Sequence, residues 1–123
     1  MIEDLLPQKD PIVMVSSLKD DNIFLEIKDD NIFLDNNIFQ EAGILEHIAQ
    51  AVIVYMYNKE KFTSIQPKIG KISNTKFERE VHKGEILETK INIRIKNDDV
   101  LDLEAISFVY AERVASTEML LIL

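Results

Sequence analysis

The chain has 123 residues, which suits one domain with its own hydrophobic core, and its composition of 46% hydrophobic and 29% charged residues is typical of a globular protein. A net charge of −8 argues against nucleic acid as a partner, and the absence of cysteine excludes disulfides and thiolate chemistry. The N-terminus does not resemble a signal peptide, and no apolar run is long enough to span a bilayer. We therefore expect one domain over residues 1–123, in the cytoplasm, with no metal ion or cofactor.

The basic residues are concentrated in one part of the chain. Residues 59–83 hold seven basic and three acidic side chains, although the whole chain is acidic. One interpretation is a solvated surface with lysines on sheet edges. The other is a docking patch for an acidic partner such as an acyl-carrier protein. Its members would be Lys68, Lys71, Lys76, Arg79 and Lys83.

The first third of the chain predicts short strands and turns. Residues 12–15 and 23–27 are apolar runs that predict buried strands. Residues 19–25 and 28–34 both have the sequence Lys-Asp-Asp-Asn-Ile-Phe-Leu, in which turn residues precede an apolar run. The copies are too short to be solenoid repeats, and we assign them no function.

Residues 41–57 predict the one long helix. Apolar residues at Ala42, Leu45 and Ile48 lie on one face at helical spacing, and further apolar residues fill much of the remaining surface. A helix that is apolar nearly all round is a buried helix. Asn58 and Lys59 provide a C-terminal stop with a cation in the last turn.

The second half of the chain predicts long strands joined by tight turns. Alternating apolar and polar residues occupy residues 67–80, 86–96, 100–110 and 114–123, with turn residues between the runs. This pattern indicates an antiparallel sheet with one polar face. A single apolar helix needs a sheet that wraps it, so the predicted architecture is α+β, the hot-dog fold with a curved antiparallel sheet around one central helix.

Three stretches resemble the dehydratases of 3-hydroxyacyl-acyl-carrier proteins. Residues 6–15 resemble their opening Leu-Pro-His-Arg-Tyr-Pro-Phe-Leu-Leu-Val, and residues 44–51, Ile-Leu-Glu-His-Ile-Ala-Gln-Ala, resemble their helix motif Leu-Ile-Glu-Ala-Met-Ala-Gln-Ala. Residues 69–85 resemble their Gly-Ile-Asp, Ala-Arg-Phe-Lys-Arg-Pro-Val and Pro-Gly-Asp run. The resemblance keeps the same order over nearly the whole chain, and the helix motif is its most specific part.

The resemblance implies a catalytic pair. The family uses a base, a His on the loop before the helix, and an acid, a Glu on the helix, which come from opposite subunits. Glu46 matches the acid residue by residue. The alternative for Glu46 is a structural hydrogen bond. We expect Glu46 in a narrow apolar tunnel at a subunit interface.

The family base has no counterpart in this chain. The loop of residues 35–41 is short and holds neither the His nor the Pro-Gly of the family; Asn36 or Asn37 stands nearest, and Asn is no general base. His47 follows Glu46 directly and points about 100° round the helix from it, so it is either a substitute base or a polar residue at a junction. His82 lies in a turn. The residues expected around the substrate are Asn36, Asn37, Phe39, Gly43 and Gln50.

Three functions remain open. The first is a dehydratase-like protein that acts on 3-hydroxyacyl thioesters of acyl-carrier protein in fatty acid or polyketide-like lipid biosynthesis, and the loop resembles the branch found in polyene-pigment clusters. The second is a degenerate subunit that binds an acyl-carrier protein or pairs with an active dehydratase. The third is an acyl thioesterase whose helix carboxylate activates water. A curved sheet with an open edge also predicts a homodimer or higher even oligomer.

Overall fold

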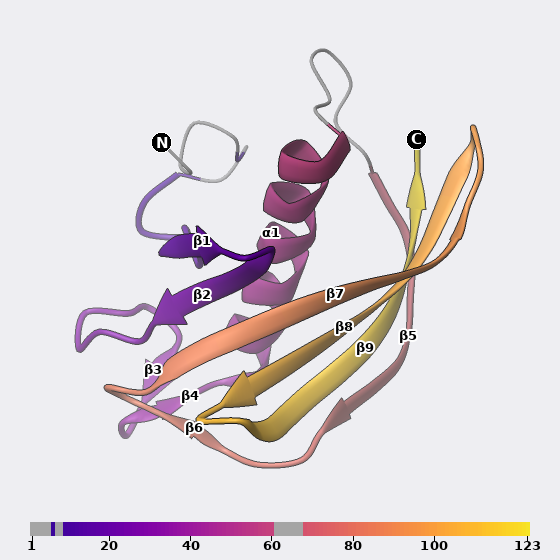
Figure 1. Cartoon of the computed structure of the whole chain (residues 1–123). Helices are drawn as coiled ribbons and strands as arrows, with labels where there is room; N and C mark the ends of the chain where they lie inside the picture. Colours follow the sequence, from indigo (N-terminus) through magenta and orange to yellow (C-terminus); the bar gives the residue numbers. More distant parts are fainter. Residues whose placement is uncertain (1–5, 7–8, 61–67) are drawn as a thin grey trace.

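The computed structural model describes residue 6 and residues 9–60 and 68–123 (Figure 1). The elements in chain order are β1 (Ser17–Lys19), β2 (Asn22–Glu26), β3 (Leu34–Asp35), β4 (Ile38–Phe39), α1 (Glu41–Glu60), β5 (Lys68–Phe77), β6 (Val81–His82), β7 (Ile86–Lys96), β8 (Val100–Val109) and β9 (Glu112–Ile122). None of the helical residues described forms a segment long and apolar enough to cross a membrane.

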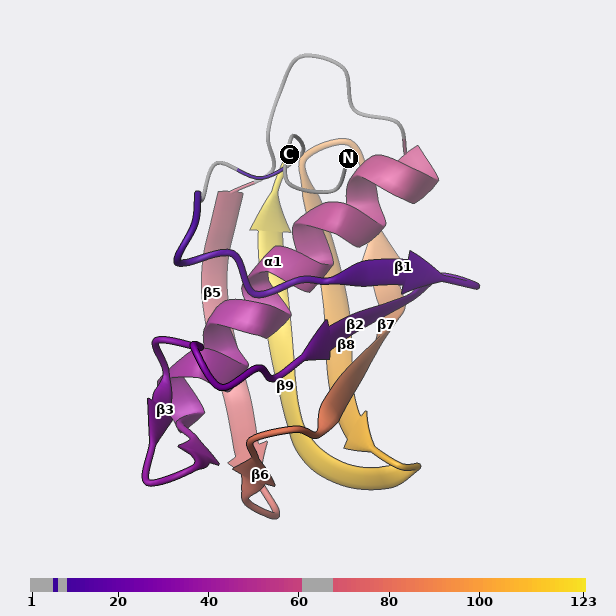
Figure 2. The ribbon, with the colours of Figure 1, turned by 90° about the vertical axis from the view of Figure 1, so that its left-hand side faces the viewer.

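The main sheet has six antiparallel strands in the order β1-β2-β7-β8-β9-β5, and a small second sheet has the order β3-β4-β6. The long strands curve around α1, with β1 and β2 on one side of the helix and β5 at the opposite edge (Figures 1 and 2). The small sheet lies at the N-terminal end of α1 (Figure 1). This arrangement is the hot-dog fold, which confirms the predicted fold class.

The helix is buried because its apolar surface meets the concave face of the sheet. Ile44, Ile48, Val52 and Met56 are each at most 2% exposed and form one core with inward-facing residues of β7, β8 and β9. Burying each such side chain fully stabilises the fold by about 1.5–3 kcal/mol. A sheet that covered only one side of α1 would leave part of this surface in water.

The long strands confirm the alternation seen in the sequence. The predicted strand over Ile86–Lys96 is β7 itself, and β8 and β9 match their predictions to within two residues. β5 ends at Phe77, three residues before the predicted end, while Pro67 lies outside the described residues. The helix begins where predicted and continues three residues further, to Glu60.

The predicted strand over residues 12–15 is wrong. The first strand begins only at Ser17, although Met14 and Val15 are buried as a strand's core residues would be. The amide N–H of Met14 donates to Oε1 of Gln50 over 2.6 Å, so the helix and not a neighbouring strand satisfies this backbone. The buried apolar run therefore reflects packing on α1.

Gly43 allows the β3–β4 segment to pack against the first turn of α1. A Cβ at this position would lie 2.6 Å from Cβ of Phe33 and 2.7 Å from the ring of Phe39. The two rings meet edge to face with centroids 6.3 Å apart. A side chain at position 43 would therefore displace both aromatic residues.

The first prediction concerns this contact. Gly43→Ala should lower the free energy of unfolding by about 1–2 kcal/mol. Contacts of 2.6–2.7 Å place the overpacking cost in the upper part of its range, at about 2–3 kcal/mol, and the gain in helix propensity returns about 1 kcal/mol. Urea denaturation measures the change. Ala42→Ser, on the exposed side of the same turn, is the matched control and should stay within about 0.5 kcal/mol of wild type. A Gly43→Ala protein as stable as wild type would contradict the packing argument.

Candidate functional site

Glu46 lies in the second turn of α1 and is half-buried. Its Oε1 accepts a hydrogen bond from Nε2 of Gln50, one helical turn later, over 3.0 Å. No described residue makes a hydrogen bond with its other oxygen, Oε2. The carboxyl group therefore has one oxygen fixed by Gln50 and one without a hydrogen-bond partner among the described residues.

Gln50 fixes that carboxyl group because every contact of its amide is determined. Its Nε2 also donates to the carbonyl of Ile12 over 2.9 Å, and its Oε1 accepts the N–H of Met14 over 2.6 Å. Since a carbonyl can only accept and an N–H can only donate, the amide has one possible orientation. Gln50 is fully buried, and both of its N–H bonds are used. It was expected to bind substrate, and in this structure it orients Glu46.

His47 is held inside the core by a chain of hydrogen bonds. Its Nδ1–H donates to the carbonyl of Met14 over 2.7 Å, which fixes the tautomer. Its Nε2 therefore accepts the hydroxyl of Thr89 over 2.8 Å, and Thr89 in turn accepts the hydroxyl of Ser107 over 2.6 Å. The His47 ring therefore links α1 to the N-terminal segment and, through Thr89 and Ser107, to β7 and β8.

The same burial keeps His47 uncharged. Desolvation lowers the pKa of His47 from 6.5 to about 4, partly opposed by the hydrogen bond to the Met14 backbone. The ring is 0% exposed, and both nitrogens already have partners. A base needs a free nitrogen beside its substrate, so these contacts favour the structural interpretation of His47.

Thr89 and Ser107 were not identified from the sequence, although a signal for them exists. Thr89 lies between Leu87 and Ile91 at inward-facing positions of β7, and Ser107 lies between inward-facing apolar positions of β8. A polar residue at such a position must find a buried partner. His47 is that partner.

The expected loop residues separate into two environments. Asn36 and Asn37 form the tight turn between β3 and β4, with φ of 49° and 66°, and both side chains are exposed. The carbonyl of Asn37 accepts the N–H of Lys83 over 2.9 Å, which joins this turn to the β6–β7 turn. Phe39 and Gly43 are buried and pack against each other. Of these four residues, only Asn36 and Asn37 are therefore exposed to solvent.

The five basic residues also separate. Lys68, Lys71 and Lys76 are exposed along β5, and Lys83 is exposed in the β6–β7 turn. Arg79 instead forms ion pairs with Glu85 over 2.7 Å and Glu112 over 3.1 Å. The hydrogen bond to Glu85 is the main cause that raises the pKa of Arg79. Two nitrogens of the Arg79 guanidinium are therefore used within the chain, while its buried Nη1 has no hydrogen-bond partner among the described residues.

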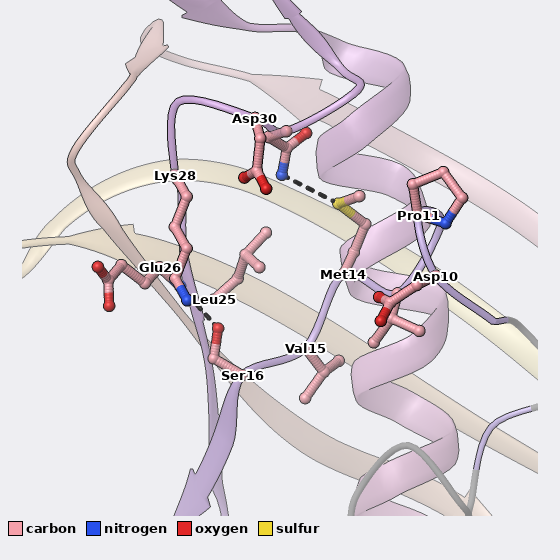
Figure 3. A pocket seen from close by; sticks show the side chains of 11 residues that line it. Asp10, Pro11, Met14, Val15, Ser16, Leu25, Glu26, Lys28 and Asp30 are labelled. Atoms are coloured by element: carbon pink, nitrogen blue, oxygen red, sulfur yellow. Dashed lines mark hydrogen bonds between the residues drawn. The ribbon is translucent and has the colours of Figure 1, made fainter.

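Two hollows lie beside these residues. One of about 550 Å³ separates residues 10–16 from residues 25–31, with Met14, Val15 and Leu25 at its wall (Figure 3). The other, of about 510 Å³, lies between β4, the first turn of α1 and the end of β5. Glu46 lines neither hollow in the single chain. The tunnel predicted around Glu46 stays a prediction about the assembled protein.

No protein-family model matches the chain, and no curated protein sequence matches it. The chain does match solved structures in its fold. A chain of the dehydratase heterocomplex ApeI:P from Xenorhabdus doucetiae is 15% identical with a TM-score of 0.77, covering 98% of this chain and 89% of that one. The E. coli PaaI protein from the phenylacetic acid degradation operon is 9% identical with a TM-score of 0.70, covering 83% and 74%. A hypothetical thioesterase with coenzyme A from Streptococcus pneumoniae is 8% identical with a TM-score of 0.68, covering 88% and 82%. At these identities the likeness establishes the shared fold.

The second prediction follows from the buried ring of His47. The folded pKa of about 4 lies below the unfolded value of 6.5, so the unfolded state binds the proton more tightly. The contribution of His47 to stability is complete above pH 6.5 and is lost as the pH falls towards 4, with a total of about 3 kcal/mol. Urea denaturation between these pH values measures it.

A variant that cannot titrate isolates this contribution from the carboxylates. His47→Gln should reduce stability at pH 7, because Met14 and Thr89 lose their partner, and it should flatten the change between pH 6.5 and 4. His82→Ala removes an exposed histidine instead and should keep the wild-type pH dependence. Equal pH dependence in wild type and His47→Gln would contradict the assigned burial.

Proposed function

We propose that the chain is a dehydratase-type subunit that acts on a 3-hydroxyacyl thioester, with Glu46 as the general acid. The observation that carries this proposal is the oriented, half-buried carboxyl group of Glu46 on the central helix, whose Oε1 is held by Gln50 and whose Oε2 has no hydrogen-bond partner among the described residues. The match of residues 44–51 to the dehydratase helix motif supports it. So does the likeness in fold to a chain of a dehydratase heterocomplex.

The chemistry needs an acid at a fixed position. A base removes the proton from the carbon next to the thioester carbonyl, the bond from the third carbon to the hydroxyl oxygen breaks, and the hydroxyl leaves as water with the proton of the acid. The product is the enoyl thioester. Because Gln50 is locked by Ile12 and Met14, Glu46 presents its free oxygen in one direction. Such preorganisation lowers the entropic part of the barrier.

Among the residues that the structure describes, none beside Glu46 can serve as the base. His47 is buried with both ring nitrogens bonded. Asn36 and Asn37 are exposed, and an amide cannot accept the substrate proton. We infer that the base is a water molecule or a side chain of another subunit. The acyl-carrier protein as the thiol carrier, and lipid biosynthesis as the context, rest on the resemblance of the sequence.

A thioesterase is the second candidate, because a helix carboxylate that orients water would hydrolyse the same thioester. The chain shares its fold with a hypothetical thioesterase that was solved with coenzyme A. The two reactions differ in their products. Dehydration gives an enoyl thioester and keeps the thioester bond, whereas hydrolysis gives a free thiol.

The third prediction tests the proposal with a 3-hydroxyacyl thioester of pantetheine and of acyl-carrier protein. Wild type should form the enoyl product, followed by mass spectrometry, without release of thiol. Glu46→Gln should lower the rate on the order of 10²-fold, as expected for loss of a general acid. Asp98→Asn makes the same change of charge in an exposed turn and should keep full activity.

Other products would decide against the proposal. Free thiol that depends on Glu46 would assign the thioesterase reaction. If the protein is folded and assembled with any partner subunit that it requires, and neither enoyl thioester nor free thiol forms, the remaining interpretation is a partner subunit without catalytic activity.

A further inference from the structure

A third hollow, of about 370 Å³, lies over β5, β8 and β9. Glu104 of β8 and Glu118 of β9 line it and stand opposite each other in the sheet. Leu103 and Met119 form the next pair and are buried in the core against α1. Since successive side chains of a strand point to opposite faces, the two glutamates point away from the helix. The hollow therefore lies on the convex face, on the other side of the sheet from Glu46.

The two carboxylates of this hollow are not equally compensated. Like charges directly opposite each other on adjacent strands destabilise a sheet. Glu118 is compensated, because Arg94 donates to its Oε1 and Asn74 donates to its Oε2. Glu104 makes no hydrogen bond or ion pair with any described residue. The carboxylate of Glu104 thus lies beside another acid without a cation of its own.

Ser116 adds an unpaired hydroxyl to the same hollow. It shares the convex face with Glu118, two residues further along β9, and it is only 4% exposed. Its hydroxyl makes no hydrogen bond with any described residue. Because buried hydroxyls are nearly always hydrogen-bonded, the partner of this one lies in the hollow, as solvent or as a ligand.

A bulge in β5 places a lysine opposite this hydroxyl. β5 has one residue more than β9 before Lys76 pairs with Ser116. Asn74, within the bulge, has a φ of 51°, which is uncommon for a residue other than glycine. Without the extra residue, Thr75 would stand opposite Ser116. Bulges re-aim side chains and are frequent beside functional sites, and this one brings Lys76 to the hollow.

The cations of the hollow have free donors. The ammonium of Lys76 makes no ion pair with any described residue. Arg113 uses Nε to bind Glu78 over 2.9 Å, and its two Nη atoms have no described partner. Rotation of Lys76 towards Glu104 would pair the two charges, but exposed pairs of this kind contribute little to stability. A ligand can therefore separate them at small cost.

We propose that this hollow binds a small zwitterion, which is a molecule with an ammonium group at one end and a carboxylate at the other. The ammonium group would bind Glu104, and the carboxylate would accept hydrogen bonds from Lys76, Ser116 and Arg113. Two cations and two anions line the hollow, so a ligand with balanced charges fits it better than an anion or a cation does.

The register of the strands also sets the length of the ligand. Lys76 stands opposite Ser116 and Glu104 stands opposite Glu118, so the two binding groups are offset by two residues of β9, or about 7 Å. The charges of the ligand should therefore be separated by several bonds, as they are in γ-aminobutyrate. This proposal does not depend on the proposed dehydration, because the hollow and Glu46 lie on opposite faces of the sheet.

The experiment titrates the wild-type chain with glycine, γ-aminobutyrate and ε-aminocaproate in a calorimeter. The two longer amino acids should bind more tightly than glycine, whose charges are too close together to reach both ends of the hollow. Butyrate and butylamine each keep one charge of γ-aminobutyrate. Each should bind about tenfold more weakly than it or worse, because one charge-assisted hydrogen bond is lost.

Variants test which residues hold the ligand. Glu104→Gln and Lys76→Gln should each weaken the binding of γ-aminobutyrate by about tenfold or more. Glu104→Gln should also unfold at the wild-type temperature or above it, since it removes the repulsion from Glu118, so a loss of binding would not come from unfolding. The matched controls are Asp98→Asn and Lys19→Gln, which make similar changes of charge at exposed positions outside the hollow. They should bind as wild type does.

Three results would overturn the proposal. One is that no amino acid of the series binds more tightly than butyrate and butylamine. Another is that γ-aminobutyrate binds Glu104→Gln and Lys76→Gln as tightly as it binds wild type. The third is that no ligand binds and Glu104→Gln lowers the unfolding temperature in wild type but not in Lys76→Gln, which would assign the two residues to a structural ion pair.

Discussion

The structure depends on one constraint, which is that α1 is apolar nearly all round and must be covered on every side. The curved sheet covers most of it, and residues 12–15 cover another part without forming a strand. The few polar residues of the buried turns each need a partner inside the protein. Gln50 and His47 find theirs in the backbone of Ile12 and Met14. The polar groups that satisfy the helix are therefore the ones that attach the N-terminal segment to it.

The hydrophobic pattern of the sequence predicted the long helix and the long strands, whose residues repeat with the period of the element they form. Apolar and polar residues alternate along most of β7, and the helix is continuous and apolar, so both were found from the sequence. The two copies of Lys-Asp-Asp-Asn-Ile-Phe-Leu show the limit of such reasoning. In residues 19–25, Asp20 and Asp21 adopt φ of 52° and 66° in the turn that joins β1 and β2. In residues 28–34 the same residues form a different turn that leads only into β3. Identical sequence takes two structures because the surroundings differ.

The candidate site could be proposed from the sequence, but its contacts could not. The helix motif singled out Glu46, because the spacing within one helix is fixed by the helix itself. The partner of His47 is Thr89, 42 residues away in the chain, and only the folded sheet brings them together. For the same reason Gln50 could be identified as part of the site while its role as the group that orients Glu46 could not. Asn36 and Asn37 were chosen by alignment with a missing histidine, and the structure uses them as a turn.

Among the described residues, the carboxyl group of the proposed acid, Glu46, is hydrogen-bonded to Gln50 and not to a group that could serve as a base. Glu46 is held in place because it lies on a buried helix and accepts a hydrogen bond from the fixed amide of Gln50. A base on the exposed β3–β4 turn would not be held in this way. In the proposed reaction the base is therefore a water molecule or a group that another subunit brings to Glu46. The helix packs mainly against β2, β7 and β8, and β5 lies at the far edge of the sheet beyond β9. Burial of the helix thus fixes the position of Glu46 within this chain.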